Sequence, residues 1–280
     1  MSFAFIDTHV HFWNQQVLPY PWLVEVPAIA GPHTPSELFA ESGGDCPEKI
    51  VFVECGAPWL DEAKWVEGLA ASESRIAGIV AKCMLNEDAT TEANLAQLRR
   101  HPLVRGVRHL TQHEPDPDFC ARPEFIAGAQ AVGAAGLSFD LCCFHHQMPA
   151  VVRLVRACPG TRFVLDHLGK PGIRARLLDP WRAHLSELAA LPNVDCKLSG
   201  LVTEADHDAW QPADLKPYVD HALAVFGPGR LLFGGDWPVA KLASPYRRWL
   251  DTARGLVAHL PAADQDAIFR RNALRVYRLV

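Results

Sequence analysis

The chain has 280 residues, with 27 Lys and Arg against 32 Asp and Glu, so its formal net charge is −5 when the histidines are neutral. This balance, without a run of basic residues, excludes nucleic acid as a partner, because such binding needs clustered positive charge. Hydrophobic residues make up 49% of the chain and charged residues 21%, which excludes a disordered chain and predicts a large buried core.

No feature of the sequence indicates a membrane partner or export. No apolar stretch approaches the roughly 20 residues that a membrane-spanning helix needs. Residues 1–7 carry no basic region ahead of an apolar one, as a signal peptide would. The cysteines include no C-x-x-C pair and fall largely in apolar runs, as in a reduced core. We therefore expect a cytoplasmic protein, and we leave its oligomeric state open.

Short apolar runs rich in β-branched residues alternate with longer amphipathic stretches, a pattern that predicts strands alternating with helices. In chain order, the predicted strands cover residues 3–10, 50–55, 76–84, 104–110, 137–143, 162–168, 194–198 and 231–235. The predicted helices cover residues 58–71, 91–101, 123–135, 148–157, 179–191, 215–225, 245–259 and 262–276.

Strands that are apolar almost throughout are typical of a parallel sheet covered on both faces. Eight such units predict an α/β fold, a closed (β/α)8 TIM barrel, and one domain over residues 1–280 because no linker divides the chain. The alternative is a doubly wound open sheet, which would normally show a Gly-rich phosphate loop after its first strand. Here that strand ends in Thr-His-Val-His. Residues 12–35 would form a long loop over the barrel mouth.

The end of the first strand carries two histidines. Because side chains alternate along a strand, His9 and His11 share one face. They lie at the C-terminal end of the strand, where barrel enzymes keep their active sites. Two such imidazoles either bind one metal ion or bind a carbonyl or carboxylate group.

Two later strands end in comparable residues. Asp166 and His167 end the sixth strand, where alternation lets only one of them face the barrel, and we expect His167 to do so because it completes a histidine cluster. Asp236 ends the eighth strand, which in a closed barrel lies beside the first strand and its histidines. A carboxylate there either deprotonates an attacking water or caps the following turn.

Three further polar residues follow apolar strands. Arg108 on the fourth strand cannot lose its proton, so we expect it at the mouth, binding an anion, polarising a carbonyl or forming a rim salt bridge. His145 and His146 follow the fifth strand and point in opposite directions, so at most one reaches the site, and both are equally well explained as loop residues.

These residues together resemble the amidohydrolase superfamily, and within it the lactonase branch that contains L-fuconolactonase, L-rhamnonolactonase and 2-pyrone-4,6-dicarboxylate lactonase. The matching segments run in family order across nearly the whole chain, at residues 7–13, 106–108, 165–171, 197–200 and 233–238. The resemblance implies a distorted barrel of the amidohydrolase type that hydrolyses a lactone or a related ester or amide.

The resemblance also assigns roles to residues. His9 and His11 match the metal-binding pair of the first strand, His167 the histidine of the sixth strand, and Asp236 the general base of the eighth strand. The family's binuclear members have a bridging lysine or acidic residue on the fourth strand, where this chain has Arg108. The resemblance therefore predicts at most one divalent metal ion, such as zinc, bound by His9, His11 and Asp236. Glu54 would be either a further ligand or a carboxylate at the rim. Hydrolysis without a metal ion stays open.

The substrate class follows from the mouth residues. A dicarboxylate would need several arginines, and the strand ends supply one, Arg108. Aromatic faces suit sugar rings, and four tryptophans lie in segments expected around the mouth: Trp13, Trp22, Trp59 and Trp237. We expect hydrolysis of an aldonolactone such as L-fucono- or L-rhamnonolactone, with Asp236 as general base and His167 and Arg108 polarising the carbonyl. The alternatives are a metal-dependent decarboxylase of an aromatic acid and a non-sugar, dicarboxylate lactonase.

Overall fold

The computed structural model describes residues 4–86 and 89–280, and it contains one sheet of parallel strands in the order β1 to β8. The strands are β1 Ile6–Val10, β2 Lys49–Val53, β3 Ile76–Lys82, β4 Val104–Arg108, β5 Ser138–Leu141, β6 Arg162–Leu165, β7 Val194–Leu198 and β8 Leu231–Phe233. Each overlaps one predicted strand, so the predicted α/β barrel is confirmed. The first residue of the first predicted strand, Phe3, lies outside the described residues.

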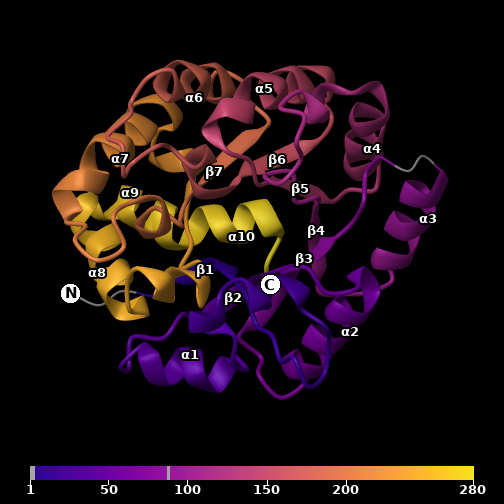
Figure 1. The fold of residues 1–280 in the computed structure, drawn as a ribbon, viewed down its shortest axis with the longest axis horizontal. Coiled ribbons are helices and arrows are strands. Elements are labelled where there is room, and N and C mark those ends of the chain that lie inside the picture. Colours follow the sequence, from indigo (N-terminus) through magenta and orange to yellow (C-terminus); the bar gives the residue numbers. More distant parts are fainter. Residues whose placement is uncertain (1–3, 87–88) are drawn as a thin grey trace.

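Helices surround the strands, and α1 to α8 each follow one strand in the chain, whereas α9 and α10 come after α8 (Figure 1). Their bounds are α1 Pro35–Glu41, α2 Trp59–Ala70, α3 Ala89–Leu98, α4 Pro123–Ala134, α5 Met148–Ala157, α6 Trp181–Ala189, α7 Pro212–Phe226, α8 Tyr246–Leu256, α9 Ala262–Asp266 and α10 Asn272–Tyr277. Helix α1 was not predicted, because it is short and follows a proline-rich loop. The last predicted helix is divided into α9 and α10 by a π-helical turn at Ala267–Arg271.

The barrel closes between β8 and β1 without a regular ladder. An isolated bridge pairs Val10 with Trp237, just beyond β8. The backbone N–H of Asp236 donates to the carbonyl of His9 at 2.7 Å, and the Thr8 hydroxyl donates to the carbonyl of Phe233 at 2.6 Å. The residues expected to carry the chemistry therefore lie in the seam that closes the barrel.

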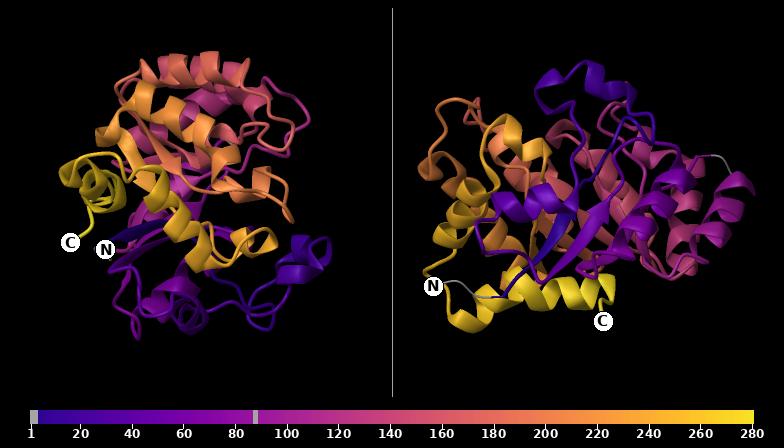
Figure 2. Two further views of the ribbon diagram at one scale, coloured as in Figure 1. Left: turned by 90° about the vertical axis from the view of Figure 1, so that its left-hand side faces the viewer. Right: turned by 90° about the horizontal axis from the view of Figure 1, so that it is seen from below.

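Helix α10 lies across one end of the barrel, on the side of the C-terminus (Figure 2). Its apolar residues Val276 and Tyr277 pack with strand residues such as Ile6, Val51 and Leu232. This end is therefore filled by side chains, which leaves the opposite end, where the strands finish, for a site. No helix among the described residues is long and apolar enough to cross a membrane.

Candidate active site

Three histidine side chains converge on one carboxylate at the C-terminal ends of β1, β6 and β8. The Nε2 atoms of His9, His11 and His167 lie 3.7, 3.6 and 3.9 Å from Oδ1 of Asp236. All four side chains are buried or nearly so. The predicted grouping of these four residues is thus present, and the distances are too long for direct hydrogen bonds.

Each imidazole is anchored through its other nitrogen. Nδ1 of His11 lies 2.7 Å from the carbonyl oxygen of Val53, and Nδ1 of His167 lies 2.9 Å from the Ser199 hydroxyl. Nδ1 of His9 faces Nζ of Lys197 at 3.2 Å and Oδ1 of Asp166, the residue after β6, at 3.3 Å. These contacts set the ring orientations, so all three Nε2 atoms are directed at the same point.

The backbone leaves the strand geometry where it positions His167 and Asp236. Both residues have left-handed conformations, with φ of 55° and 53°. Gly200 lies against the His167 ring, and a Cβ on it would sit 2.3 Å from Nδ1 of that ring. Only glycine therefore allows this close approach.

This backbone geometry corrects the expectation that only one of Asp166 and His167 faces the barrel. Both are buried at the site, because β6 ends at Leu165 and strand alternation no longer applies after it. Asp166 lies behind the histidines, with Oδ1 3.0 Å from Nζ of Lys197 and Oδ2 3.3 Å from Nη1 of Arg108. It was not among the candidate site residues.

A buried ionic network extends from the histidines toward α10. Nζ of Lys197 donates to Oδ2 of Asp140 at 2.6 Å, and the Tyr277 hydroxyl donates to the same oxygen at 2.7 Å. Burial would lower the pKa of Lys197, but Asp140 and Asp166 outweigh burial and raise it. Lys197 is therefore a charged interior partner that holds the rear of the site.

The electrostatic environment separates the charge states of the cluster. Burial lowers the pKa of His9 well below its usual range and brings that of His167 to about 4, so both rings are neutral near pH 7. Burial would raise the pKa of Asp236, but His167, His11 and His9 outweigh burial and hold it below its usual range. The site thus combines neutral imidazoles with an ionised carboxylate.

A cavity of about 390 Å³ opens above this cluster. Its lining includes His11, His167, Asp236 and Arg108. Further polar residues line the rest of it, namely Gln112, His113, Lys170, Thr203, Glu204 and His207. Apolar surface lies between them, contributed by Trp22, Leu110, Phe144, Val239 and Leu242. A volume of this size accommodates a small organic molecule.

Of the tryptophans expected around the substrate, Trp22 lines this cavity. Trp13 and Trp237 are fully buried in the core, where their indole N–H groups donate to Gly31 and Glu41. Trp59 is half-buried against the core at the start of α2. The expected aromatic ring around the mouth is therefore corrected, since loop tryptophans here mainly stabilise the loop over the barrel.

His145 and His146 form a short 3-10 helix after β5, and neither lines the cavity. Nδ1 of His145 lies 3.0 Å from the carbonyl oxygen of Lys170, and the exposed His146 ring stacks on Phe144. Their contacts agree with the alternative that both are loop residues. His145 instead supports the segment that carries Lys170.

Glu54 and Arg108 form a buried ion pair, with Nε of Arg108 2.8 Å from Oε1 of Glu54. The second oxygen of Glu54 accepts the backbone N–H of Gly56 at 3.0 Å. Glu54 is not in the groups of converging metal-ligand atoms found among the described residues. Arg108 combines two of its expected roles, because it forms this salt bridge and also lines the cavity.

Asp7 is a further residue of the site that was not among the predicted site residues. Its Oδ1 accepts the backbone N–H groups of Gly235 at 2.7 Å and of His9 at 3.0 Å, and its Oδ2 accepts the Tyr246 hydroxyl at 2.9 Å. It lies two residues before His9, so strand alternation already places it on the same face. That signal was available in the sequence.

The donor set fits one divalent metal ion. His9, His11 and Asp236 each offer a ligand atom, and these atoms lie within 4.8 Å of one another. Nε2 of His9 is buried without a hydrogen-bond partner, as expected of a nitrogen reserved for a ligand. Two imidazoles and a carboxylate suit zinc.

The family model described as Amidohydrolase matches residues 6–279. The chain belongs to the amidohydrolase family. It is 35% identical to an L-fucono-1,5-lactonase of Burkholderia multivorans over 98% of this chain and 96% of that protein. It is 33% identical to an L-fucono-1,5-lactonase of Burkholderia ambifaria, over 98% and 95% of the two chains. These relatives confirm the predicted enzyme class, a hydrolase of the amidohydrolase lactonase branch.

A solved structure agrees with this assignment. A Burkholderia multivorans amidohydrolase crystallised with bound zinc superimposes on this amidohydrolase with a TM-score of 0.90 at 33% identity, covering 99% of this chain and all of that one. Metal binding is thus compatible with a barrel of this shape.

Proposed function

We propose that this amidohydrolase opens a neutral, sugar-derived lactone, an aldonolactone such as L-fucono- or L-rhamnonolactone, to the free hydroxy acid. The observation that carries the proposal is the ionised Asp236, which faces a small-molecule cavity and is surrounded by the Nε2 atoms of three histidines. The similarity to two L-fucono-1,5-lactonases supports the choice of substrate class.

In the proposed reaction, Asp236 accepts a proton from water as the water oxygen bonds to the lactone carbonyl carbon. His167 and Arg108, which both line the cavity, polarise the carbonyl oxygen. The bond between the carbonyl carbon and the ring oxygen then breaks, and Asp236 returns its proton to that oxygen. The product is a hydroxy acid, and the base is regenerated.

His9, His11 and Asp236 would hold one divalent metal ion, such as zinc, in this proposal. When bound, such an ion makes water more acidic and polarises a carbonyl group. Two features of the protein favour it. The first is that Nε2 of His9 is buried without a hydrogen-bond partner, so it is available to a ligand.

The second feature is an imbalance of buried charge. The ionic cluster behind and beside the histidines contains four carboxylates and two cations, with the carboxylates on Glu54, Asp140, Asp166 and Asp236 and the cations on Arg108 and Lys197. Buried carboxylates without counter-charge are costly. A divalent cation would balance the excess.

The charges of the cavity favour a neutral substrate over a dicarboxylate. Arg108 is already paired with Glu54 and Asp166, and Lys170 is paired with Glu204. A dicarboxylate would need two uncommitted cations, each making a bidentate or charge-assisted contact. A polyhydroxylated ring has no such requirement.

The test is proton release by the purified protein on a panel of L-fucono-, L-rhamnono-, L-galactono- and D-galactonolactones, with background hydrolysis subtracted. We expect acceleration on at least one sugar lactone, loss of activity after chelation, and its return with zinc. Activity that survives chelation would overturn the proposed need for a metal ion but not the proposed lactonase activity. Silence on every sugar lactone with zinc supplied, together with hydrolysis of a dicarboxylate lactone or release of carbon dioxide from an aromatic acid, would overturn the proposal.

A further inference from the structure

An ion pair lines the same cavity as Asp236. Nζ of Lys170 is 3.4 Å from Oε1 of Glu204, and both residues line the cavity. Their side chains are 16% and 19% exposed, so they are largely removed from solvent while still facing the cavity. The reaction proposed above uses neither residue.

The backbone that carries Lys170 is held in an uncommon conformation. His167, Leu168, Gly169 and Lys170 are consecutive residues with positive φ, at 55°, 52°, 71° and 46°. For residues other than glycine, each such conformation costs free energy and persists where the surrounding structure enforces it, often at a functional site. The same strained segment therefore directs His167 and Lys170 into one cavity.

The pair retains unused hydrogen-bonding capacity. Its separation of 3.4 Å exceeds the 2.7–2.9 Å of a strong charge-assisted hydrogen bond. An ammonium group has three donors, and a carboxylate has two acceptor oxygens. Next to the pair, the ammonium lies 5.2 Å from the centre of the Phe144 ring. A ligand can thus bind to both groups without breaking the pair.

We propose that Lys170 and Glu204 recognise two adjacent hydroxyl groups of the substrate and so select polyhydroxylated lactones. This inference rests on the proposed lactonase function and names the contacts that set its specificity. Each hydroxyl is both a donor and an acceptor, so one hydroxyl accepts from the ammonium while its neighbour donates to the carboxylate. The pair carries no net charge, which agrees with a neutral substrate.

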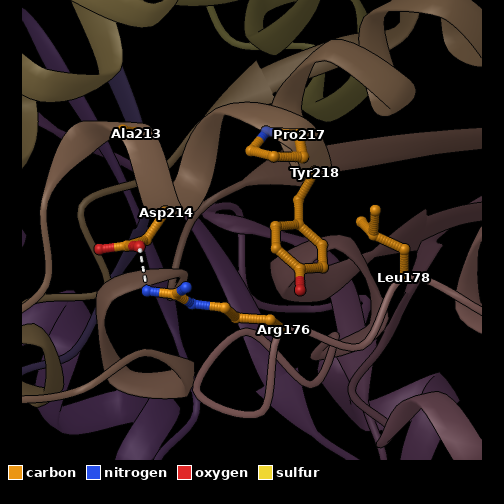
Figure 3. A pocket seen from close by; sticks show the side chains of 6 residues that line it. All are labelled: Arg176, Leu178, Ala213, Asp214, Pro217 and Tyr218. Carbon is orange, nitrogen blue, oxygen red and sulfur yellow. Dashed lines mark ion pairs between the residues drawn. The ribbon is translucent and has the colours of Figure 1, made fainter.

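A second ion pair nearby provides a matched control. Nη2 of Arg176 lies 3.6 Å from Oδ1 of Asp214, beside a separate hollow of about 240 Å³ (Figure 3). Arg176 also has a positive φ, and it belongs to the same stretch of chain between β6 and α6. However, it is 85% exposed and does not line the catalytic cavity.

The experiment compares K170M, E204Q and the control R176Q on two substrates: the sugar lactone that the wild type opens fastest, and δ-valerolactone, which has no hydroxyl groups. We expect K170M and E204Q to lower kcat/KM on the sugar lactone by about tenfold to a hundredfold, as for the loss of a hydrogen bond to a charged group. The loss should lie mainly in KM, and kcat/KM on δ-valerolactone should stay unchanged. R176Q should match the wild type on both substrates.

Equal losses on the two lactones would overturn the inference, because the pair would then support the site in general. Unchanged kinetics on the sugar lactone would also overturn it while leaving the lactonase function intact. If the wild type opens no lactone, the proposed function is wrong. Calorimetric titration with L-fucose then tests the role of the Lys170–Glu204 pair separately. Binding to the wild type that is about tenfold weaker in K170M supports the inference. Equal binding, or none to the wild type, overturns it.

Discussion

The two sides of the barrel are joined in different ways. Between β2 and β3, four residue pairs form a parallel ladder with one shift of register between Ile50 and Val51. Between β8 and β1, one isolated bridge is supplemented by hydrogen bonds from side chains and from residues beyond the end of β8. The ladder is held together by backbone hydrogen bonds, so it tolerates many different side chains. The seam needs the particular side chains that hydrogen-bond across it.

Asp7 shows why this difference matters for function. It bonds to the backbone of Gly235 on one side and of His9 on the other, so it holds the end of β8 against β1. Asp236 follows Gly235 directly. The contacts that close the barrel therefore also position Asp236, the proposed base, beside the histidines. In the seam, a change to the fold is therefore expected to change the proposed chemistry as well.

The largest effect that we predict is a loss of catalytic activity in the seam without a loss of stability. Asp236→Asn should lower kcat/KM by roughly 10² to 10⁴, the usual contribution of a general base. Asn tolerates the left-handed backbone at this position, so the unfolding midpoint in urea should stay close to that of the wild type.

Asp195→Asn is the matched control for that change. Asp195 on β7 is also buried, but it pairs with Arg162 and Arg275 and does not line the cavity. We expect D195N to keep its kcat/KM, measured in the same assay. If D236N loses less than about tenfold, Asp236 is not the general base.

The second prediction compares how much stability is lost when a methyl group is added in the seam and in the ladder. A Cβ on Gly235 would lie 2.4 Å from Oδ2 of Asp7 and 2.6 Å from Cε2 of Tyr246, both held in the buried seam. On Gly78 of β3 it would meet Cδ2 of Leu279 at 3.0 Å and Cγ of Arg105 at 3.3 Å, which can move. Gly235→Ala should therefore destabilise the protein by about 1–3 kcal/mol and reduce turnover, while G78A costs less and keeps turnover.

Urea unfolding and lactone hydrolysis of the two variants, measured side by side, check this prediction. Equal losses of stability would show that the seam is no more sensitive than the ladder. Full activity in a destabilised G235A would show that barrel closure and the position of the base are separable after all.

The regular part of the molecule could be predicted from sequence because it follows simple periods. Apolar β-branched runs located all eight strands, and alternation along β1 placed His9 and His11 on one face, as their ring separation of 5.0 Å confirms. Closure of the barrel placed Asp236 beside them. These inferences needed only strand geometry and strand order.

The irregular part could not be predicted in the same way. Alternation fails after β6, where left-handed residues bring both Asp166 and His167 to the site. The partners of Arg108 and Lys197 depend on which side chains meet across the barrel interior, and sequence spacing does not contain that information. Aromatic composition was also a poor guide, because Trp13 and Trp237 serve packing rather than the cavity.

The prediction with the smallest expected effect on turnover concerns a buried acid on α2, the helix between β2 and β3. Glu62 of α2 accepts the backbone N–H and the thiol of Cys55 through Oε2 and Oε1, each at 3.2 Å. Burial, with the charge of Glu54, raises the pKa of Glu62 from 4.5 to about 8. The folded protein therefore keeps a proton that the unfolded chain loses, so the unfolding free energy should fall as the pH rises from about 4.5 to about 8.

Glu62→Gln removes this titration while keeping an acceptor oxygen for Cys55. In the wild type, Glu62 should contribute a slope of up to about 1.4 kcal/mol per pH unit across that window, and E62Q should lack it. Urea unfolding at several pH values measures both slopes, with the exposed neighbour Asp61→Asn expected to behave as the wild type does. Because Glu62 does not line the cavity, E62Q should keep its kcat/KM. Parallel pH curves for E62Q and the wild type would mean that Glu62 is already ionised in the fold, whereas a loss of turnover would extend the coupling of fold and chemistry beyond the seam.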